Sequence, residues 1–277
     1  MKILDVKNLS IYTNNKKIVN NLSFSLKKGE CLGILGESGS GKSMTCKAIM
    51  GLLDSHRFKI DGEAIYLNEN LLDKNKEDMR QIRGKDIAMI LQNPMTCFDP
   101  LYNIGYQIEE TLKEHIGINS KIRKSYAIEI LKKMKIRNPE EVLSKFPHQL
   151  SGGMLQRIMI GLSLSMNPSI IIADEPTTAI DSITQFEIMK EFLYIKEKHD
   201  VALIFISHDI GVINKIADKV IVMNNGNSEL SGDLNSLFNQ KDESFTKNLI
   251  DKKMAVMNRY KEILKIGENN ATRSKKY

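Results

Sequence analysis

The stretch Gly36-Glu37-Ser38-Gly39-Ser40-Gly41-Lys42-Ser43 decides the fold. Two glycines separated by four residues and followed at once by Lys and Ser form the pattern of a phosphate-binding loop. Glycine has no Cβ, so successive backbone N–H groups can turn toward phosphate oxygens without a clash. In this loop we expect Lys42 to reach the β- and γ-phosphates of a nucleotide and the Ser43 hydroxyl to hold Mg²⁺.

The residues on either side of the loop have the pattern that such a loop needs. The apolar run Cys31–Leu35 before it predicts a buried strand, and Met44, Ala48 and Ile49 after it recur at helical spacing. A helix that begins at the loop directs the positive end of its dipole at bound phosphate. Strand, loop and helix together indicate a nucleotide-binding unit.

Short apolar runs and helical patterns alternate along much of the chain. The runs Ile170–Ala173, Val201–Ile206 and Val220–Met223 lack an apolar-polar alternation, which favours a parallel sheet covered on both faces. Near the start, Ile3–Ser10 and Leu22–Leu26 do alternate, which indicates antiparallel strands with one exposed face. The sequence thus predicts an α/β fold that opens with an antiparallel β region.

The middle of the chain is predicted to be helical. Ile108, Leu112 and His115 fall on one helix face, and a second helix is expected to begin near Asn119-Ser120. The buried face of that second helix is predicted from residues that recur every four positions, which are Ile122, Tyr126, Ile130 and Met134. Residues 93–163 are therefore expected to form a helical insert in an α/β chain.

Two adjacent carboxylates follow one of the apolar runs. In Ile170–Glu175 the run ends with Asp174 and Glu175, and ligands of open α/β sheets bind at the carboxyl ends of strands. We expect Asp174 to belong to the Mg²⁺ shell. Glu175 is the predicted general base that polarises the attacking water.

A second glycine-containing stretch opens a helical pattern. In Leu150–Arg157, Ser151, Gly152 and Gly153 precede Met154 and the apolar positions of a helix. Backbone N–H groups at the start of a helix bind phosphate. Taken alone, the stretch fits an ordinary glycine-rich helix cap as well as a phosphate site.

Composition and charge exclude several classes of protein. The 277 residues are 42% apolar and 27% charged, which is typical of a globular chain. The sequence has no apolar run long enough to span a bilayer and no signal-peptide pattern, so the chain is expected in the cytoplasm. Three scattered cysteines predict free thiols. Residues 241–277 hold ten Lys or Arg and five Asp or Glu, nearly all of the net charge of +6. A nucleic-acid groove on the body of the fold is not indicated.

In this order, the phosphate loop, the Ser-Gly-Gly stretch and the Asp-Glu strand resemble the ATP-binding cassette (ABC) family. The resemblance implies ATP and Mg²⁺ as ligands and a RecA-like P-loop NTPase core. It also implies that Ser151, Gly152, Gly153 and Met154 form the signature that faces the ATP of a second subunit. Lys42, Glu175 and His208 would then be catalytic. Three further motif residues follow from the family pattern, which are Gln92 in the Q-loop near Mg²⁺ and the membrane partner, Asp181 in the D-loop, and Tyr12 stacked on adenine.

The resemblance also implies how the chain is divided. Residues 1–277 would form a single ABC ATPase domain. Its β subdomain and RecA-like core would span 1–92 and 164–235, and its helical subdomain 93–163. A basic helical tail would follow over 236–277.

Some stretches resemble the peptide, nickel and opine-metallophore import group in particular. These are Gln92–Pro100, Gly105–Ile108, His115 and Ser244–Lys247, although the tail lacks the usual Pro before its aromatic residue. The absence of any cysteine after Cys97 favours the nickel or metallophore type over the longer peptide type. The group implies a second ATPase, more often a different chain than a copy, two membrane permease subunits and an extracytoplasmic binding protein. Such a subunit lies at the cytoplasmic face of the membrane.

Two other nucleotide-binding classes fit less well. A small P-loop kinase would have no use for Leu150–Gln156. A DNA-associated or other non-transport ABC ATPase of the repair type would place long coiled coils between the loop and the signature. Here roughly a hundred residues without sustained heptads separate Ser43 from Ser151. The transported cargo stays open, because this subunit need not touch it.

Overall fold

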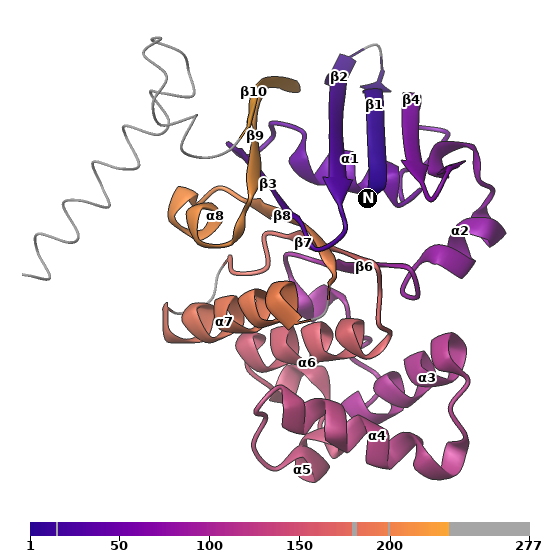
Figure 1. Ribbon diagram of the computed structural model, residues 1–277. Coiled ribbons are helices and arrows are strands. Elements are labelled where there is room, and N and C mark those ends of the chain that lie inside the picture. Colours follow the sequence, from indigo (N-terminus) through magenta and orange to yellow (C-terminus); the bar gives the residue numbers. More distant parts are fainter. Residues whose placement is uncertain (15, 179–181, 199, 233–277) are drawn as a thin grey trace, which may run out of the picture.

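Two β-sheets form the framework of the computed structural model, which describes residues 1–14, 16–178, 182–198 and 200–232 (Figure 1). Among these residues, an antiparallel sheet has the strand order β2-β1-β4-β5 and a larger sheet has the order β10-β9-β3-β8-β7-β6. The smaller sheet comprises β1 (Lys2–Thr13), β2 (Lys16–Lys27), β4 (Lys59–Tyr66) and β5 (Glu69–Asn70). The larger comprises β3 (Cys31–Gly36), β6 (Ile87–Ile90), β7 (Ile170–Asp174), β8 (Ala202–Ser207), β9 (Lys219–Asn224) and β10 (Asn227–Gly232).

The centre of the larger sheet is parallel and buried on both faces. Strand β3 pairs in parallel with β8 and β9, and β7 pairs in parallel with β6 and β8. Every residue of β3, β7 and β8 is buried. Because neither face meets water, these strands show no apolar-polar alternation. The prediction of an α/β fold with a parallel sheet is confirmed.

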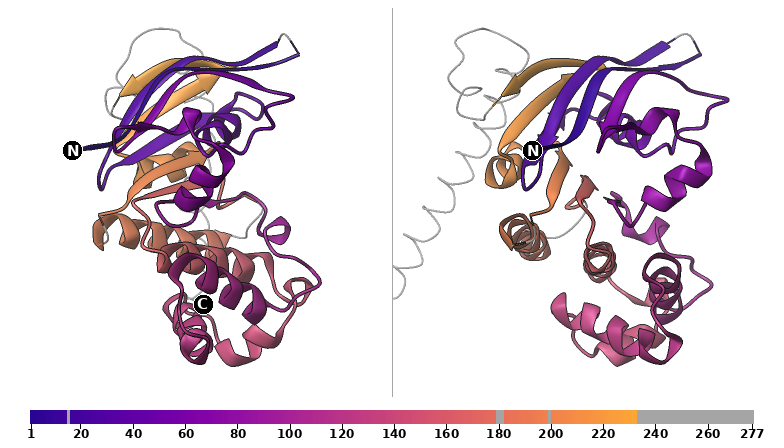
Figure 2. Two further views of the ribbon diagram at one scale, coloured as in Figure 1. Left: turned by 90° about the vertical axis from the view of Figure 1, so that its right-hand side faces the viewer. Right: turned by 45° about the vertical axis from the view of Figure 1, so that its right-hand side comes forward.

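Each face of the parallel sheet belongs to a different apolar core. On one face Leu32, Ile34 and Ile172 join the antiparallel sheet and helix α1 (Lys42–Ile49). On the other face, Leu203 and Phe205 pack beneath α7 (Ser182–Lys198), with α6 (Gly152–Ser165) and α8 (Ile210–Ile216) beside it. Figure 2 shows the sheet between these layers. The alternation of side chains along each strand thus assigns one half of the residues to each core.

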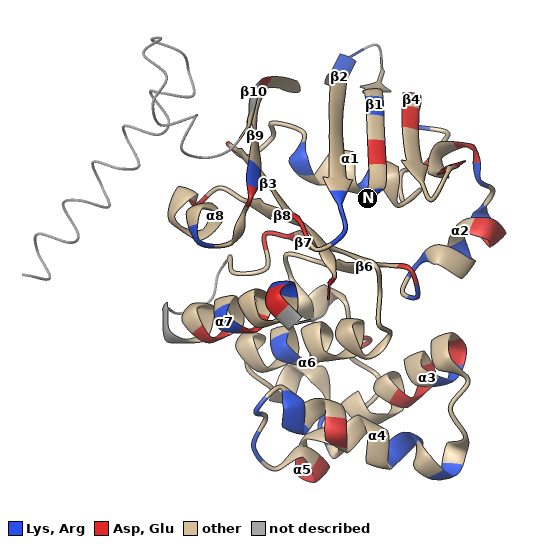
Figure 3. Cartoon of the chain, in the orientation of Figure 1, with Lys and Arg blue, Asp and Glu red and all other residues tan. Residues whose placement is uncertain are grey.

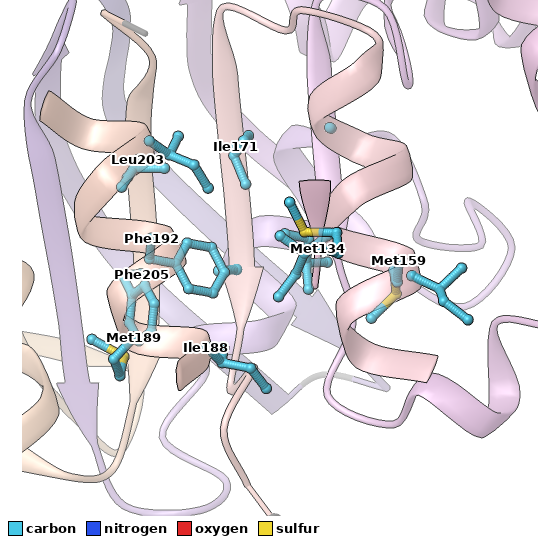
Figure 4. Packing of buried hydrophobic residues seen from close by; sticks show 14 of the residues in the cluster. Met134, Met159, Ile171, Ile188, Met189, Phe192, Leu203 and Phe205 are labelled. Atoms are coloured by element: carbon cyan, nitrogen blue, oxygen red, sulfur yellow. The ribbon is translucent and has the colours of Figure 1, made fainter. Parts of the chain in front are cut away.

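The ring of Phe192 on α7 meets the ring of Phe205 on β8 edge to face, 5.2 Å apart at an interplanar angle of 86° (Figure 4). Both side chains are fully buried. Aromatic pairs in this geometry add about 0.5–1.5 kcal/mol beyond their buried area. Helix α7 is therefore fixed to the parallel sheet.

The antiparallel sheet contains one long strand that the sequence pattern did not reveal. Strands β1 and β2 confirm the two predicted alternating stretches. Strand β4 pairs with β1 but carries Asp61, Gly62 and Glu63, residues that are rare in strands. Gly62 has a φ of +108°, and a Cβ there would lie 2.7 Å from two backbone oxygens of β1. Pairing with β1 therefore overrides the weak strand propensity of this stretch.

Residues 94–165 form helices that cover one end of the sheet (Figure 1). They comprise the single turns η2 (Pro94–Thr96) and η3 (Pro147–Gln149) and the helices α3 (Ile104–Ile116), α4 (Ser120–Lys133), α5 (Pro139–Ser144) and α6 (Gly152–Ser165). Asn119 caps α4, because its side chain accepts a hydrogen bond from the Lys121 backbone N–H. Two single elements lie elsewhere, which are η1 (Leu71–Asp73) and α2 (Lys76–Ile82).

The predicted buried face of α4 is wrong at its first member. Ile122 is 55% exposed, whereas Ile130 and Met134 are buried. The buried residues of α4 begin at Ala127 and include Leu131, a spacing of three and four residues. Ile122 lies in the first turn of α4, before this buried stripe begins. A strict four-residue repeat drifts around a helix of 3.6 residues per turn.

None of the described helices is long and apolar enough to cross a membrane. The three cysteines are free thiols, as predicted. Burial raises the pKa of the Cys31 and Cys46 thiols, so both stay protonated. Basic and acidic residues are interspersed over the described elements (Figure 3). The basic tail over 236–277 and Ser244–Lys247 lie outside the described residues.

Candidate nucleotide-binding site

The phosphate loop joins the end of β3 to the start of α1. Gly39 and Gly41 have φ angles of +83° and +103°, which side chains rarely allow. A Cβ on Gly36 would lie 2.4 Å from the Met223 backbone oxygen and 2.6 Å from Ser40 Oγ. The glycines therefore permit both the path of the loop and its packing against β9.

Lys42 lies at the centre of the loop and is only 4% exposed. Its Nζ donates to the backbone oxygens of Gly36 at 2.9 Å and Glu37 at 2.8 Å. The same Nζ lies 4.0 Å from Glu175 Oε1. A buried ammonium requires such partners. Its position inside the loop suits an interaction with an anionic ligand.

Ser43 and Asp174 meet although 131 positions separate them in the sequence. Ser43 Oγ donates to Asp174 Oδ1 at 2.8 Å. Burial is the main cause of a raised Asp174 pKa, which the charge of Glu175 raises further, while the Ser43 hydrogen bond, Lys47 and Lys42 lower it. Hydroxyl and carboxylate oxygens are the ligands that Mg²⁺ prefers. This pair therefore fits the predicted metal.

The Glu175 carboxylate contacts side chains that follow three different strands. Its Oε2 accepts hydrogen bonds from Gln92 Nε2 at 2.9 Å and Thr178 Oγ1 at 3.0 Å, and His208 Nδ1 lies 3.4 Å away. Gln92 follows β6 and His208 follows β8. The Glu175 backbone has a φ of +47°, uncommon for a residue with a side chain. This turn directs the carboxylate toward the loop rather than continuing β7.

These residues surround one cavity of about 590 Å³, within the range of small-molecule sites. Its lining comprises Ile18, Glu37, Ser38, Gly39, Gly41, Lys42, Ser43, Met44, Gln92, Glu175, Thr178 and His208. Ser40 Oγ beside the loop is buried, without a hydrogen-bond partner among the described residues. The predicted Lys42, Ser43, Gln92, Glu175 and His208 thus come together.

The sequence analysis did not assign three lining residues to the cavity, although Met44 belongs to the predicted helix and Thr178 opens the stretch that resembles the D-loop. Ile18 and Met44 are apolar neighbours of the loop, and Thr178 fixes the Glu175 carboxylate. Thr178 lies three residues after Glu175, a spacing that a tight turn brings into contact. The Thr178 backbone N–H donates to the Glu175 backbone carbonyl oxygen at 3.1 Å. Only this short spacing could have revealed the contact.

Two predicted groups lie apart from this cavity. Tyr12 lines a different hollow of about 670 Å³ with residues of 55–61, and the Lys17 and Lys59 ammonium groups lie 5.3 and 5.7 Å from its ring centroid. The signature residues begin α6, where Ser151 Oγ accepts from the Met154 backbone N–H at 3.3 Å. They do not line the loop cavity. Asp181 lies outside the described residues.

The comparisons with known proteins agree with this geometry. The family model for "ABC transporter" matches residues 19–178. The chain is 42% identical to the metal-staphylopine import system ATP-binding protein CntD of Staphylococcus aureus over 267 residues, 96% of this chain and 98% of the relative. It is also 42% identical to the dipeptide transport ATP-binding protein DppD of Haemophilus influenzae over 255 residues, 90% of this chain and 77% of the relative.

Solved structures show the same fold. A dimeric ATP-binding cassette in a post-hydrolysis state, bound to ADP and Pi, superposes with a TM-score of 0.73 at 28% identity, covering 83% of this chain and 98% of that one. The family model covers more than half of the chain, and its matched range includes both the loop and the Asp174–Glu175 strand end. The chain therefore belongs to the ABC transporter family, as an ATP-binding subunit whose ATPase activity is coupled to transport.

Proposed function

We propose that this chain hydrolyses ATP in the loop cavity to drive an importer of metal chelates of the metallophore type. One observation carries the proposal for the chemistry. Lys42, Ser43, Glu175, Gln92 and His208 arrive from four strand ends and line one cavity. Each supplies a group that phosphoryl transfer to water requires.

The loop and Lys42 bind the triphosphate. The backbone N–H groups of the loop and the start of α1 favour negative charge. Lys42 adds a full positive charge. Its attraction to the phosphate oxygens strengthens as the bond between the γ-phosphoryl group and ADP breaks. Mg²⁺ held by Ser43, Asp174 and Gln92 would neutralise charge on the phosphate oxygens.

Glu175 acts on the attacking water. Its carboxylate orients the water and accepts its proton as the bond to phosphorus forms. Gln92 and Thr178 each hold Oε2 by one hydrogen bond, so the carboxylate has a defined direction. His208 lies on the same side and contacts the γ-phosphate in this proposal. Orientation of this kind accounts for a large share of catalysis in such sites.

The signature at α6 serves a second ATPase subunit. Ser151, Gly152, Gly153 and Met154 begin a helix but do not line their own chain's cavity. We assign this helix end to the ATP of a facing subunit, which completes a site that neither chain holds alone. Asp181 and Tyr12 are assigned to the subunit interface and to adenine, respectively. A dimeric arrangement among similar cassettes supports the assignment.

The remaining partners are proposed on the similarity to the relatives. We assign the chain to the cytoplasmic face of the membrane, bound to two permease subunits and supplied by an extracytoplasmic binding protein. A distinct second ATPase is favoured over a second copy. Two relatives support this assembly, one an import-system ATP-binding protein and the other a dipeptide transport ATP-binding protein. No nucleic-acid partner is proposed.

The extent of the similarity favours the metallophore cargo over a peptide. The match with CntD covers 96% of this chain, whereas the match with DppD covers 90% of it. Uptake of a metal–opine chelate by cells with and without the gene tests this cargo. Unchanged chelate uptake together with lost dipeptide uptake would assign the subunit to peptides.

The chemistry is tested by Glu175→Gln, which keeps size and hydrogen-bonding capacity but removes the basic carboxylate. We expect ATP binding close to the wild-type level and turnover lower by about 10²–10⁴-fold. Binding of a fluorescent ATP analogue and release of phosphate are the two measurements. Turnover that survives the substitution would show that Glu175 is not the base.

A further inference from the structure

Helix α7 presents one line of side chains to the helices of residues 94–165. Thr184, Glu187 and Glu191 lie three and four residues apart, so they share one face of α7. We name these three residues the α7 contact line. Each contacts a different point of the helical segment, two at α6 and one after α4. Figure 1 shows α7 between the sheet and these helices.

The first contact is at the signature itself. A Cβ on Gly153 would lie 2.6 Å from Thr184 Cγ2, closer than side chains approach one another. The absence of a side chain at Gly153 therefore lets α7 lie directly against the first turn of α6. By contrast, no described residue would lie within 4 Å of a Cβ on Gly152. Among the described residues, packing therefore requires a glycine at Gly153 but not at Gly152.

The second contact lies one helical turn further along both helices. Arg157 is four residues after Gly153, and its guanidinium forms an ion pair with Glu187, three residues after Thr184. The Arg157 side chain is 20% exposed and that of Glu187 is 51% exposed. Ion pairs this exposed add little to global stability. A fork of donors facing a carboxylate does fix direction.

The third contact is at the far end of the same line. Lys135 Nζ, just after α4, lies 3.0 Å from Glu191 Oε1, and the Glu191 side chain is only 17% exposed. Helix α7 is itself fixed to the sheet by Phe192 against Phe205 (Figure 4). It therefore connects the sheet that carries Asp174 and Glu175 to the helix that carries the signature.

We propose that the α7 contact line positions the signature helix relative to the catalytic strand end of the same chain. Thr184 and Glu187 are positioning residues, because they act through Gly153 and Arg157 and touch no reacting atom. They set the angle at which the Ser151 end of α6 meets the facing subunit. This inference rests on the proposed function, since the signature must serve a second ATPase.

Glu187→Gln tests the inference, because it removes the charge and keeps the shape. The protein is measured in complex with its second ATPase subunit. We expect kcat to fall about tenfold, while nucleotide affinity and unfolding temperature stay at wild-type values. The matched control is Glu63→Gln, which removes the exposed ion pair of Lys7 and Glu63, 3.6 Å apart on the antiparallel sheet. The control is expected to leave kcat unchanged.

A charge exchange separates positioning from structural damage. Arg157→Glu alone should lower kcat at least as much as Glu187→Gln. The double variant Arg157→Glu with Glu187→Arg should recover most of the loss, because the ion pair is restored with reversed polarity. A double variant no better than the singles overturns the inference. So does a fall in nucleotide affinity that matches the fall in kcat.

A second variant and a reference variant complete the design. Glu191→Gln breaks the contact with Lys135, farther from Ser151, and should give a smaller fall in kcat than Glu187→Gln. If wild type, Glu187→Gln and Glu191→Gln have equal kcat, the inference is overturned but the proposed function is not. Turnover by Glu175→Gln at the wild-type rate overturns the proposed function and, with it, this inference.

Discussion

The loop cavity and the signature helix α6 are both assigned to ATP phosphate, yet they are built in different ways. The cavity gathers its groups from the ends of β3, β6, β7 and β8, whose positions the parallel register fixes. Its polar and charged groups form hydrogen bonds across long sequence separations. The signature helix has one local cap and is held from outside by α7. The cavity therefore gathers its groups within one chain, whereas the signature helix is proposed to act on the ATP of a second chain.

Removal of the Lys42 charge should weaken nucleotide binding in the cavity more than any other change proposed here. Lys42→Ala deletes the ammonium that the loop carbonyls and Glu175 surround. We expect the affinity for ATP to fall by at least about 100-fold, since a buried charge pair with phosphate is lost. Titration with a fluorescent ATP analogue measures it. Lys28→Ala, at an exposed lysine near Asp200, is the control and should bind normally. Unchanged affinity in Lys42→Ala would remove the loop from the site.

A bulky signature residue should separate the two regions. Ser151→Arg places a long side chain at the end of α6, which does not line the cavity of its own chain. We expect nucleotide affinity to stay within about twofold of wild type and turnover to fall by 10²-fold or more, roughly the loss from one misplaced catalytic group. Equal losses in binding and turnover would mean that the signature contributes to its own chain's site.

Close helix packing predicts a smaller effect, on stability. A Cβ on Gly161 of α6 would lie 2.5 Å from Met134 Cγ and 3.0 Å from Ile130 Cγ2. Gly161→Ala should destabilise the protein by about 1–3 kcal/mol through overpacking, partly offset by the better helix propensity of Ala. Chemical unfolding measures the change. Gly232→Ala is the control, because none of the residues that the structure describes lies within 4 Å of a Cβ built there. Equal stability of both variants would contradict the tight contact of α4 with α6.

The smallest expected change in stability is at Asp174, on the metal side of the cavity, where stability and function make opposite demands. Burial raises the Asp174 pKa, so at neutral pH the folded state holds a carboxylate that it disfavours. Asp174→Asn should therefore raise the unfolding free energy by about 0.5–2 kcal/mol at pH 7 while abolishing Mg²⁺-dependent turnover.

The gain should disappear as the pH falls through the pKa of Asp174, because the wild-type carboxyl is then neutral as well. Unfolding curves at pH 7 and at acidic pH provide the comparison. A variant less stable than wild type at pH 7 would mean that the Ser43 hydrogen bond outweighs burial.

The difference between the two regions also explains what could be predicted from the sequence. Strands β3, β7 and β8 were predictable because burial on both faces leaves continuous apolar runs. Lys42, Ser43, Asp174 and Glu175 follow such runs directly. Strand β4 was not predictable, since Asp61, Gly62 and Glu63 pair with β1 despite their low strand propensity. The short helices α2 and α8 were also missed.

The contacts that hold α6 were beyond reach for a different reason. Arg157 and Glu187 lie on two separate helices, and no periodicity links them. Ile122 was assigned to the core although it is exposed, because the repeat alone does not fix where α4 becomes covered. The sequence pattern predicts what each element buries. It does not predict how two exposed helix faces are joined.

The central claim is that ATP joins the loop cavity of one subunit to the signature of another. Its most direct test is the mass of Glu175→Gln by light scattering, with ATP–Mg²⁺ and with ADP, alone and mixed with the second ATPase subunit of its transporter. We predict a pair of subunits in ATP only, about twice 31.5 kDa if the chain pairs with itself, and loss of the pair when Ser151→Arg is added. The account would be contradicted if Glu175→Gln binds ATP but its mass is the same in ATP and in ADP, both alone and with the second subunit.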